Sequence, residues 1–315
     1  MNDDFVLTAE NYYSKEADER YMSVHQYLDF IGHMGIIGCE ERALAKLHGE
    51  YEEETTTALL VGSYVDSYFE GTLEQFKKEH PECFAVSLEF AKPFSEMQEE
   101  YPHMFTKGGR LKGEWTKTRI KAEYPSLLKE ALTLKTVYQQ ADKMIERCEK
   151  DEFFMQTMSG EKQRIMTGYL FGCDWKIKMD SYIPDVAIVD LKTSANIHKA
   201  WRVKDYGYAS FIEYWGYTLQ GAIYQKIVEI NTGKKLPFYI SVVTKEDSPE
   251  IAVINIDQMT LDHSLNEIEM NMPSLLMVKN GEVEPTRCEC CDYCKATKKL
   301  MAPISMMDLI TEGGL

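Results

Sequence analysis

The chain has 315 residues, of which 44% are apolar and 27% charged, and its formal net charge is −16. This length and balance predict a globular protein with a substantial core, arranged as one large domain or two ordinary ones. The negative charge argues against a protein that coats a polyanion with its whole surface. No apolar run approaches the ~20 residues that cross a bilayer, and the first residues lack the pattern of a signal peptide, so we expect a cytoplasmic protein without a membrane partner.

The first half of the chain is predicted to be mainly helical. Residues 1–22 are polar, and we expect them to be loosely ordered. Helical periodicity follows and is interrupted near residues 35–38, which predicts two short helices. An apolar helix is predicted over residues 58–71 and an amphipathic helix at about 127–151. We therefore expect a helical part over residues 23–155.

From about residue 156 the pattern changes from helical to alternating. The predicted elements are strands at 164–182 and 185–194, a helix at 210–233, strands at 238–245 and 250–256, and a helix at 258–279. This order predicts an α/β fold with a central mixed β-sheet flanked by helices. We expect a single domain over residues 23–300, with its core at 156–300 and a tail at 301–315.

The residues from 176 to 194 predict a hairpin that carries charged side chains on one face. Side chains alternate along a strand, so Asp190 and Lys192 lie on the same side. Pro184 and Asp185 have suitable turn chemistry, and a turn there pairs residues whose numbers sum to about 370, which sets Asp180 opposite Asp190. Two carboxylates about 5 Å apart repel each other unless a cation lies between them.

A divalent cation is the natural partner for such a pair. Aspartate oxygens suit Mg²⁺ or Mn²⁺, and the carbonyl oxygen of Leu191 could complete the site. Lys192 would then orient or deprotonate a water molecule, or neutralise a phosphate, which is the chemistry of metal-assisted phosphodiester hydrolysis. The alternative is an exposed strand face on which Asp190 and Lys192 form an ordinary surface pair.

These residues resemble a known family. Asp180, followed by "VDLKTS" at 189–194 and "YTLQGAIY" at 217–224, resembles the PD-(D/E)XK nuclease superfamily, in the branch with the RecB nuclease domain, lambda exonuclease and the RecE-type (exodeoxyribonuclease VIII-like) phage exonucleases. The resemblance covers most of residues 23–294. It implies a restriction-endonuclease-like core with a helical N-terminal elaboration. The literal dipeptide "PD" at 184–185 lies in the predicted turn and is not assigned to the motif.

The resemblance implies roles for the residues of this motif. Asp180 corresponds to the first metal-binding aspartate, Asp190 to the second acidic ligand and Lys192 to the catalytic lysine. Gln220 and Tyr224 are similar to the helix pair that lies beside the active site in the family, and their i, i+4 spacing puts both on one helical face. The alternative for this pair is the ordinary polar edge of an amphipathic helix.

The family also has an upstream helix that brings an acidic residue or a histidine to the metal. The sequence "LLVGSYVDSYFEG" matches the Gly-x-x-x-His form of this helix, with Asp66 in the histidine position. The resemblance therefore implies that Asp66 is a further ligand, and an anionic one that favours Mg²⁺ over softer metals. The alternative places Asp66 on the solvent side of its helix.

Half of the eight cysteines are crowded at Cys288, Cys290, Cys291 and Cys294. In an intracellular chain such crowding indicates metal ligands or thiols, not disulfides. The group resembles that of the AddB and Cas4 nucleases, in which three C-terminal cysteines and one upstream cysteine hold a [4Fe-4S] cluster, and Cys39 occupies the upstream place. Those relatives usually have a wider gap before the last cysteine and no counterpart of Cys290. One alternative is therefore a zinc site formed by Cys39, Cys288, Cys291 and Cys294, and the other is unligated thiols.

Residues 107–121 are the one basic stretch of note. A nuclease needs local positive charge to hold phosphates, so this stretch and the strand before Asp180 are candidates for DNA binding. The candidate residues are Lys107, Arg110, Lys112, Trp115, Lys117, Arg119, Lys121, Lys176 and Lys178. We expect Trp115 to stack on an unpaired base. The alternative is a solvated loop.

The resemblance implies a Mg²⁺- or Mn²⁺-dependent deoxyribonuclease. The function we expect is a phage-type exonuclease that resects linear duplex DNA ends for a single-strand annealing protein. The alternatives are a Cas4-like single-strand exonuclease, a catalytically inactive protein that binds DNA ends, and an interaction module organised by a metal. Relatives that thread DNA often form rings, so a homo-oligomer is a further expectation.

Overall fold

The computed structural model describes residues 5–303, 305 and 306, which form two compact units. The sheet unit comprises Met1–Glu54, Cys148–Thr244 and Glu250–Leu315, and the ribbon unit comprises Thr55–Arg147 and Lys245–Pro249. The single domain expected over 23–300 stays a prediction, because compactness alone does not show that either unit folds by itself. Most of the expected tail at 301–315 lies outside the described residues.

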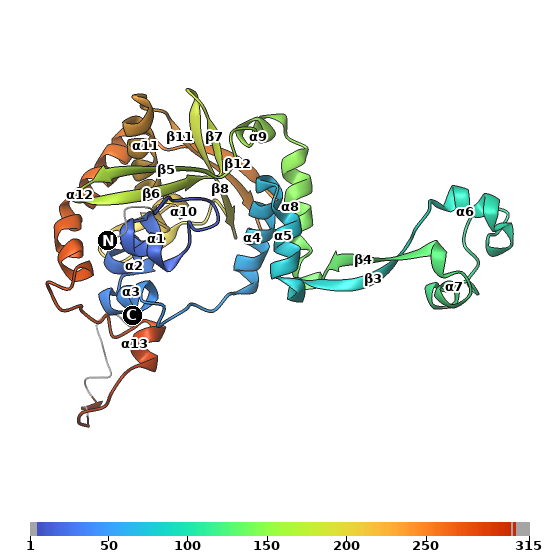
Figure 1. Cartoon of the computed structure of the whole chain (residues 1–315), viewed down its shortest axis with the longest axis horizontal. Coiled ribbons are helices and arrows are strands. Elements are labelled where there is room, and N and C mark those ends of the chain that lie inside the picture. Colours follow the sequence, from blue (N-terminus) through green and yellow to red (C-terminus); the bar gives the residue numbers. More distant parts are fainter. Residues whose placement is uncertain (1–4, 304, 307–315) are drawn as a thin grey trace. The chain divides into compact units, whose positions relative to one another are not determined.

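Six strands lie at the centre of the sheet unit (Figure 1). They are β5 (Arg164–Leu170), β6 (Cys173–Met179), β7 (Ser181–Ile183), β8 (Ala187–Ser194), β11 (Phe238–Thr244) and β12 (Ile251–Asn255). Four of them form a sheet in the order β12-β11-β8-β7, in which β8 and β11 are parallel and the other pairs antiparallel. β5 and β6 form a separate antiparallel pair. The predicted α/β fold with a mixed sheet is confirmed.

The other elements of the sheet unit are helices and two small hairpins. The helices are α1 (Lys15–Arg20), α2 (Val24–Ile31), α3 (Glu40–Leu47), α9 (Glu152–Thr157), α10 (Phe211–Tyr214), α11 (Tyr217–Thr232), α12 (Gln258–Lys279) and α13 (Asp292–Ala296). The hairpins pair β1 (Gly32–His33) with β2 (Ile36–Ile37), and β9 (Trp201–Val203) with β10 (Gly207–Ala209). Among the described helices, none has both the length and the apolar character needed to cross a membrane.

The core of the sheet unit is built around β8 and α11. The first five residues of β8 are buried, as expected for a central strand that is covered on both faces. α11 packs against β11 and α12, so it is apolar over most of its circumference. Gly221 permits this close approach, because a Cβ there would lie 2.7 Å from the ring of Phe238 and 2.9 Å from the side chain of Leu261.

The described part of residues 1–22 is folded, so the expectation that this segment is loosely ordered is wrong. Tyr12 and Ala17 are buried, and the segment contains helix α1. The backbone N–H of Met22 donates to the carbonyl of Asp174, and the N–H of Lys176 donates to the carbonyl of Met22. These backbone hydrogen bonds hold the end of the segment against β6, while many of its polar side chains stay exposed.

The ribbon unit is named after a two-stranded ribbon that joins two groups of helices (Figure 1). Its strands are β3 (Phe84–Phe90) and β4 (Leu128–Leu134), and its helices are α4 (Thr57–Glu70), α5 (Leu73–Glu79), α6 (Phe94–Glu100), α7 (Lys117–Glu123) and α8 (Gln140–Glu149). The helix predicted at 127–151 is therefore too long at its start. Residues 128–134 pair with β3, so tertiary pairing overrides their helical periodicity there.

Candidate active site

The turn between β7 and β8 sets the register of the candidate site. The two strands pair through Ser181↔Val189, Tyr182↔Ile188 and Ile183↔Ala187, and the residue numbers of each pair sum to 370. This is the register that the turn chemistry predicts. Asp185 lies in the turn with a φ of 64°, a left-handed conformation that aspartate tolerates better than most residues. One further step of the same register sets Asp180 opposite Asp190.

Asp180 lies at the junction of β6 and β7, and its side chain reaches β8. Its Oδ2 accepts a hydrogen bond of 2.8 Å from the backbone N–H of Leu191. The N–H and C=O of one strand residue point toward the same neighbouring strand, so the Leu191 carbonyl is directed to this edge of β8 as well. Asp180 therefore contacts the backbone of Leu191, the residue whose carbonyl the sequence analysis proposed as a metal ligand.

Asp190 is buried, with 2% of its surface exposed, and two side chains contact its two oxygens. The Nζ of Lys192 lies 2.5 Å from Oδ2 of Asp190. The Nε2 of Gln220, on α11, donates a hydrogen bond of 2.7 Å to Oδ1. A buried carboxylate needs such partners, because an unpaired buried charge is strongly unfavourable. The alternative of an exposed surface pair is wrong for Asp190 and Lys192.

Two tyrosines of α11 accompany Gln220. The hydroxyl of Tyr224 donates to the carbonyl of Lys178 over 3.2 Å, so Tyr224 joins α11 to β6 beside the site. The ring centroid of Tyr217 lies 5.0 Å from Nζ of Lys192, a cation–π contact that the sequence analysis did not propose. Tyr217 stands three residues before Gln220 and could have been found from that helical spacing.

The charges of the site control the protonation of its lysine and of a tyrosine. Burial opposes a charged lysine, but Asp190, Tyr217 and Asp180 together raise the pKa of Lys192 above its ordinary value. Lys192 is therefore a cation at neutral pH. Burial, together with the charges of Asp190 and Asp180, raises the pKa of Tyr224, so its phenol keeps its proton.

His25 of α2 is a neighbour of this site that the sequence analysis missed. It reaches solvent at a pocket of about 370 Å³ that Asp29 and Lys46 also line. The surrounding atoms desolvate the ring, and this effect, followed by the charge of Lys192, lowers the pKa of His25. A lone histidine early in a helix has no motif partner, so no spacing signal connected it with the strands.

Two of the lysines proposed to bind DNA are covered by the N-terminal segment. Lys176 is 2% exposed, its Nζ lies 2.7 Å from Oδ1 of Asp18, and it also donates to the carbonyl of Tyr12. Lys178 is half-buried, with its Nζ 4.4 Å from the ring centroid of Tyr13. The proposal that Lys176 contacts DNA is therefore wrong, because its charge is satisfied inside the protein.

The Lys176–Asp18 pair leads to an asymmetric prediction. Replacing Asp18 by alanine leaves a buried ammonium without its counter-charge, and we expect a loss of about 3 kcal/mol in the free energy of unfolding. Lys176→Met removes the buried charge and keeps the packed stem, and the partly exposed Asp18 can be hydrated, so we expect a loss of about 1 kcal/mol. Urea unfolding followed by circular dichroism measures both. A larger loss for Lys176→Met would contradict the account.

Asp66 and the basic stretch belong to the ribbon unit. Asp66 lies near the middle of α4, where its charge acts on Lys245 of the same unit. Of the basic stretch, all six lysines and arginines keep some exposed surface. Trp115, by contrast, is buried. It is 7% exposed and packs with Met104 and Ile120 in a small core. The expectation that Trp115 stacks on a base is wrong, because the small core uses its ring.

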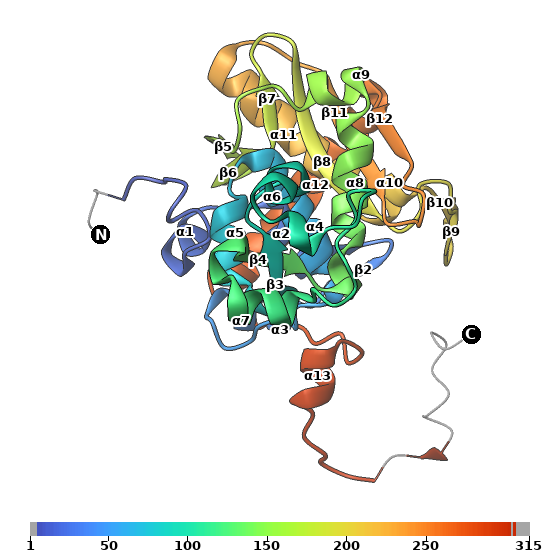
Figure 2. The same ribbon diagram turned by 90° about the vertical axis from the view of Figure 1, so that its right-hand side faces the viewer.

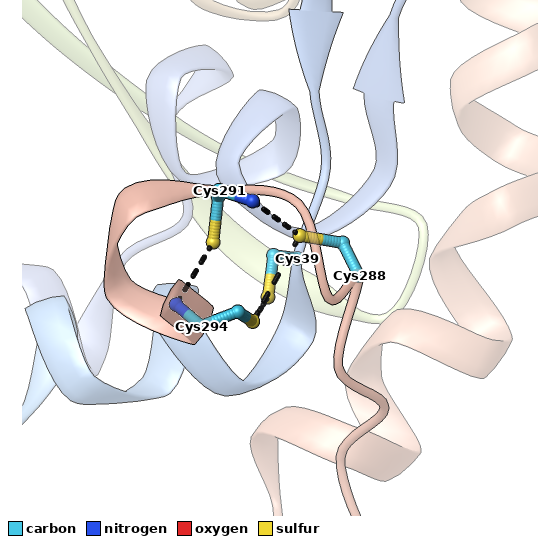
Figure 3. A group of neighbouring side chains, drawn as sticks. All are labelled: Cys39, Cys288, Cys291 and Cys294. Atoms are coloured by element: carbon cyan, nitrogen blue, oxygen red, sulfur yellow. Dashed lines mark hydrogen bonds between the residues drawn. The ribbon is translucent and has the colours of Figure 1, made fainter. Parts of the chain in front are cut away.

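Four cysteines converge within the sheet unit (Figure 3). The sulfur atoms of Cys39, Cys288, Cys291 and Cys294 all lie within 4.8 Å of one another. Cys39 immediately precedes α3, and Cys294 lies on α13 at the other end of the chain. Cys290 is exposed and stands outside the group. The structure thus selects the same four cysteines that the resemblance implied.

The distances within this group bear on the kind of metal it suits. The Sγ of Cys294 lies 3.5 Å from that of Cys39 and 3.9 Å from that of Cys288. One tetrahedral zinc with Zn–S bonds of about 2.3 Å requires sulfurs about 3.8 Å apart. A cubane cluster binds each thiolate to a different iron and requires a separation of about 6 Å. All the separations within the group are 4.8 Å or less and so are shorter than a cubane cluster requires.

The acidity of the thiols agrees with a metal site. Burial alone would raise the pKa of Cys288, but the N–H groups of Cys290 and Cys291 lower it to about 6. The thiolate of Cys288 is therefore present at neutral pH, and the thiolate is the form that binds metal. Burial raises the pKa of Cys294 to about 12, so this thiol needs a bound cation to ionise.

The sequence and the fold are similar to those of known proteins. The family model described as "PDDEXK-like domain of unknown function (DUF3799)" matches residues 23–297. A crystal structure from Eubacterium rectale, described as a "Putative exonuclease", shares 49% sequence identity, covers 99% of this chain and 100% of its own, and has a TM-score of 0.80. The structure of SSO0001 covers 73% of this chain and 83% of its own at 13% identity, and its TM-score of 0.21 carries no argument. No curated protein matches.

Proposed function

The chain belongs to the PDDEXK-like domain family, and on that premise we propose that it is a divalent-metal-dependent deoxyribonuclease. We propose further that it is an exonuclease that resects the ends of linear duplex DNA, as in recombination of the phage type. The observation that carries the proposal is the contact of Asp190 with Lys192 and Gln220, with Asp180 beside them on the backbone of β8. The similarity to the E. rectale protein supports the exonuclease part.

The donor groups of this site fit Mg²⁺ or Mn²⁺. Asp180, Asp190 and the carbonyl of Leu191 offer only oxygen atoms, which both ions prefer. Each carboxylate oxygen has two lone pairs. An oxygen of Asp180 or Asp190 that already accepts one contact can therefore bind an ion with its other lone pair. When bound, such an ion would stabilise the charge that develops on the phosphate and make water a stronger nucleophile.

The remaining residues of the site have roles that follow from their contacts. Lys192, a cation at neutral pH, would hold a phosphate oxygen or orient a water molecule and would not start as a base. Gln220 fixes the orientation of Asp190 through Oδ1. Tyr224 holds α11 to β6, so it is a positioning residue. These roles need no movement of the backbone.

We propose that the ribbon unit also serves the reaction. Asp66 would be a further metal ligand. The exposed basic residues of the ribbon unit would hold the DNA backbone. These are Lys107, Arg110, Lys112, Lys117, Arg119 and Lys121. Arg119 and Lys121 form exposed ion pairs with Glu123 and Glu130, which are weak enough to exchange for phosphate.

We propose that the four-cysteine group binds one zinc ion with a structural role. Its sulfur spacing supports a single tetrahedral ion over a [4Fe-4S] cluster. The group joins residues that are 255 positions apart in the chain, so an ion there closes a very long loop. All four donors are cysteine sulfurs, which leaves no open position for substrate.

Digestion of labelled DNA tests the nuclease proposal. We expect Mg²⁺ to support the release of short products from the ends of a linear duplex, and EDTA to stop it. Closed circular DNA of the same sequence should stay intact, because it has no ends. Equal cleavage of circles would contradict the exonuclease part, and a preference for single-stranded ends would favour the single-strand alternative. No cleavage with any divalent ion would contradict the nuclease itself.

A further inference from the structure

The segment between β8 and α11 is tied to the candidate active site at both of its ends. It begins after Ser194, the last residue of β8, two positions beyond Lys192. It ends at Tyr217, the first residue of α11, whose ring contacts the ammonium of Lys192. Hairpin β9–β10 and helix α10 lie in this segment, and Figure 2 shows the hairpin standing out from the rest of the sheet unit. The hairpin is therefore connected to the active site through both of its flanking segments.

The two faces of hairpin β9–β10 differ in character. The register pairs Trp201 with Ala209 and Arg202 with Tyr208. Trp201 and the buried Ala209 share the inner face, and the Trp201 ring stacks on that of Tyr214 at a centroid distance of 4.5 Å and an angle of 16°. Arg202 and Tyr208 therefore share the outer face. Tyr208 is 72% exposed, so most of its ring is open to solvent.

The outer face also collects positive charge in a strongly acidic protein. Lys204 is two residues from Arg202 along the same strand direction, and both are exposed. Lys199 is exposed just before the hairpin, but its Nζ lies 3.7 Å from the ring centroid of Trp201, so it belongs to the inner face. Of the nearby acids, Glu213 accepts hydrogen bonds from Tyr206 and Ser210. Asp205 is exposed in the turn of the hairpin, next to Lys204. The surface therefore combines two cations and one acid with the exposed rings of Tyr206 and Tyr208.

The base of the hairpin is rigid. The carbonyl of Tyr214 accepts a hydrogen bond from the N–H of Gly35, and a Cβ on Gly35 would collide with the Tyr214 ring at 2.0 Å. Ser210 and Glu213 form a capping box at the start of α10. The outer face is thus presented on a fixed support, which lowers the entropic cost of binding a flexible ligand.

We propose that the outer face of hairpin β9–β10 binds single-stranded DNA beside the active site, with Tyr208 stacked on a base and with Arg202 and Lys204 on phosphates. This inference rests on the proposed nuclease function. A duplex hides the faces of its bases inside the stack, so an exposed tyrosine finds a π-face in an unpaired strand. Alternating cations match the regular charge of a nucleic-acid backbone better than they match a protein surface.

Binding of a fluorescein-labelled oligothymidylate of 20 nucleotides, followed by anisotropy in EDTA to prevent cleavage, tests this proposal. We expect Tyr208→Ala to raise the Kd about tenfold, as for the loss of one base stack, and Tyr208→Phe to restore it. We expect Arg202→Ala/Lys204→Ala to reduce the magnitude of the slope of log K against log salt by about 1.4, which corresponds to two phosphate contacts. Urea unfolding should be unchanged for Tyr208→Ala, since its side chain is exposed.

Two control variants separate this surface from general effects. Tyr169 on β5 is 67% exposed, and Tyr169→Ala should leave the Kd unchanged. Lys234→Ala/Lys235→Ala removes two exposed cations elsewhere and should not change the salt slope. If the wild-type protein cleaves DNA but the hairpin variants bind like the wild type, the hairpin proposal is overturned and the nuclease proposal stands. If the wild-type protein neither cleaves nor binds DNA, both are overturned.

Discussion

Replacing Lys192 by methionine is expected to reduce the rate of DNA cleavage about a thousandfold, within the range found for the loss of a positioned catalytic group. The Nζ of Lys192 lies 2.5 Å from Asp190, so the substitution removes the ammonium that would face the phosphate. It also leaves the carboxylate of Asp190 buried without this partner, and we expect the free energy of unfolding to fall by about 3 kcal/mol. Single-turnover digestion of an end-labelled duplex in Mg²⁺ and urea unfolding measure the two effects.

A double variant separates the catalytic loss from the structural one. Asp190→Asn/Lys192→Met removes both charges, and the amide oxygen introduced in place of the Asp190 carboxylate can still accept the hydrogen bond from Gln220. We expect the stability of this variant to return to within about 1 kcal/mol of the wild type, because no charge stays buried. Its activity should stay as low as that of Lys192→Met. Recovery of cleavage in the double variant would show that the assigned chemistry is wrong.

The raised pKa of Lys192 also fixes the pH range in which its charge supports the fold. A group whose pKa is higher in the folded state contributes stability that is fully present below its unfolded pKa, about 10.4 for lysine. This contribution is lost as the pH rises through the folded pKa. The ion pair is therefore constant across the neutral range, and we expect Lys192 to contribute no pH dependence of cleavage there.

The hairpin of β7 and β8 could be predicted from the sequence because two independent local rules agree. Turn chemistry at Pro184 and Asp185 fixes the register, and the pleat fixes the face of each side chain. Together they set Asp180 beside the backbone of Leu191, as found. Gln220 was assigned from the resemblance to the helix motif of the family, and it contacts Asp190. Local rules were sufficient for Asp180 and Leu191 because these residues lie close to the same turn, between β7 and β8.

The parts that could not be predicted depend on contacts between distant segments. Lys176 alternates with apolar residues and was expected to be exposed, yet Asp18 and the carbonyl of Tyr12 cover it. Nothing near Lys176 in the sequence encodes that cover. Trp115 is likewise surrounded by basic residues but faces a small core. The charge of a segment does not show which of its residues are exposed when a few apolar residues among the charged ones form a core of their own.

The largest effect on stability is expected at the four-cysteine group. Cys294 is fully buried, and Cys294→Ser should remove one zinc per chain and lower the free energy of unfolding by several kcal/mol, about 3 kcal/mol or more. The reason is that the ion joins Cys39 to the C-terminal cysteines across 255 positions. The partly buried ion pair of Arg287 with Glu41 and the exposed hydrogen bonds of Thr286 to Glu40 lie at the same junction, and we expect each to contribute less than the ion.

Cys290 provides a matched control for that substitution. It lies between two proposed ligands but is exposed and outside the group, so Cys290→Ser should keep both the metal and the stability. Elemental analysis of anaerobically purified protein counts zinc and iron directly, and the unfolding curve of each variant gives the stability. Four irons per chain with a brown colour would show that the cysteines hold a cubane cluster and that their spacing adapts to it. Equal metal loss in both variants would show that the ligands are not the four cysteines named here, because only one of these two substitutions removes a sulfur from the tetrahedron.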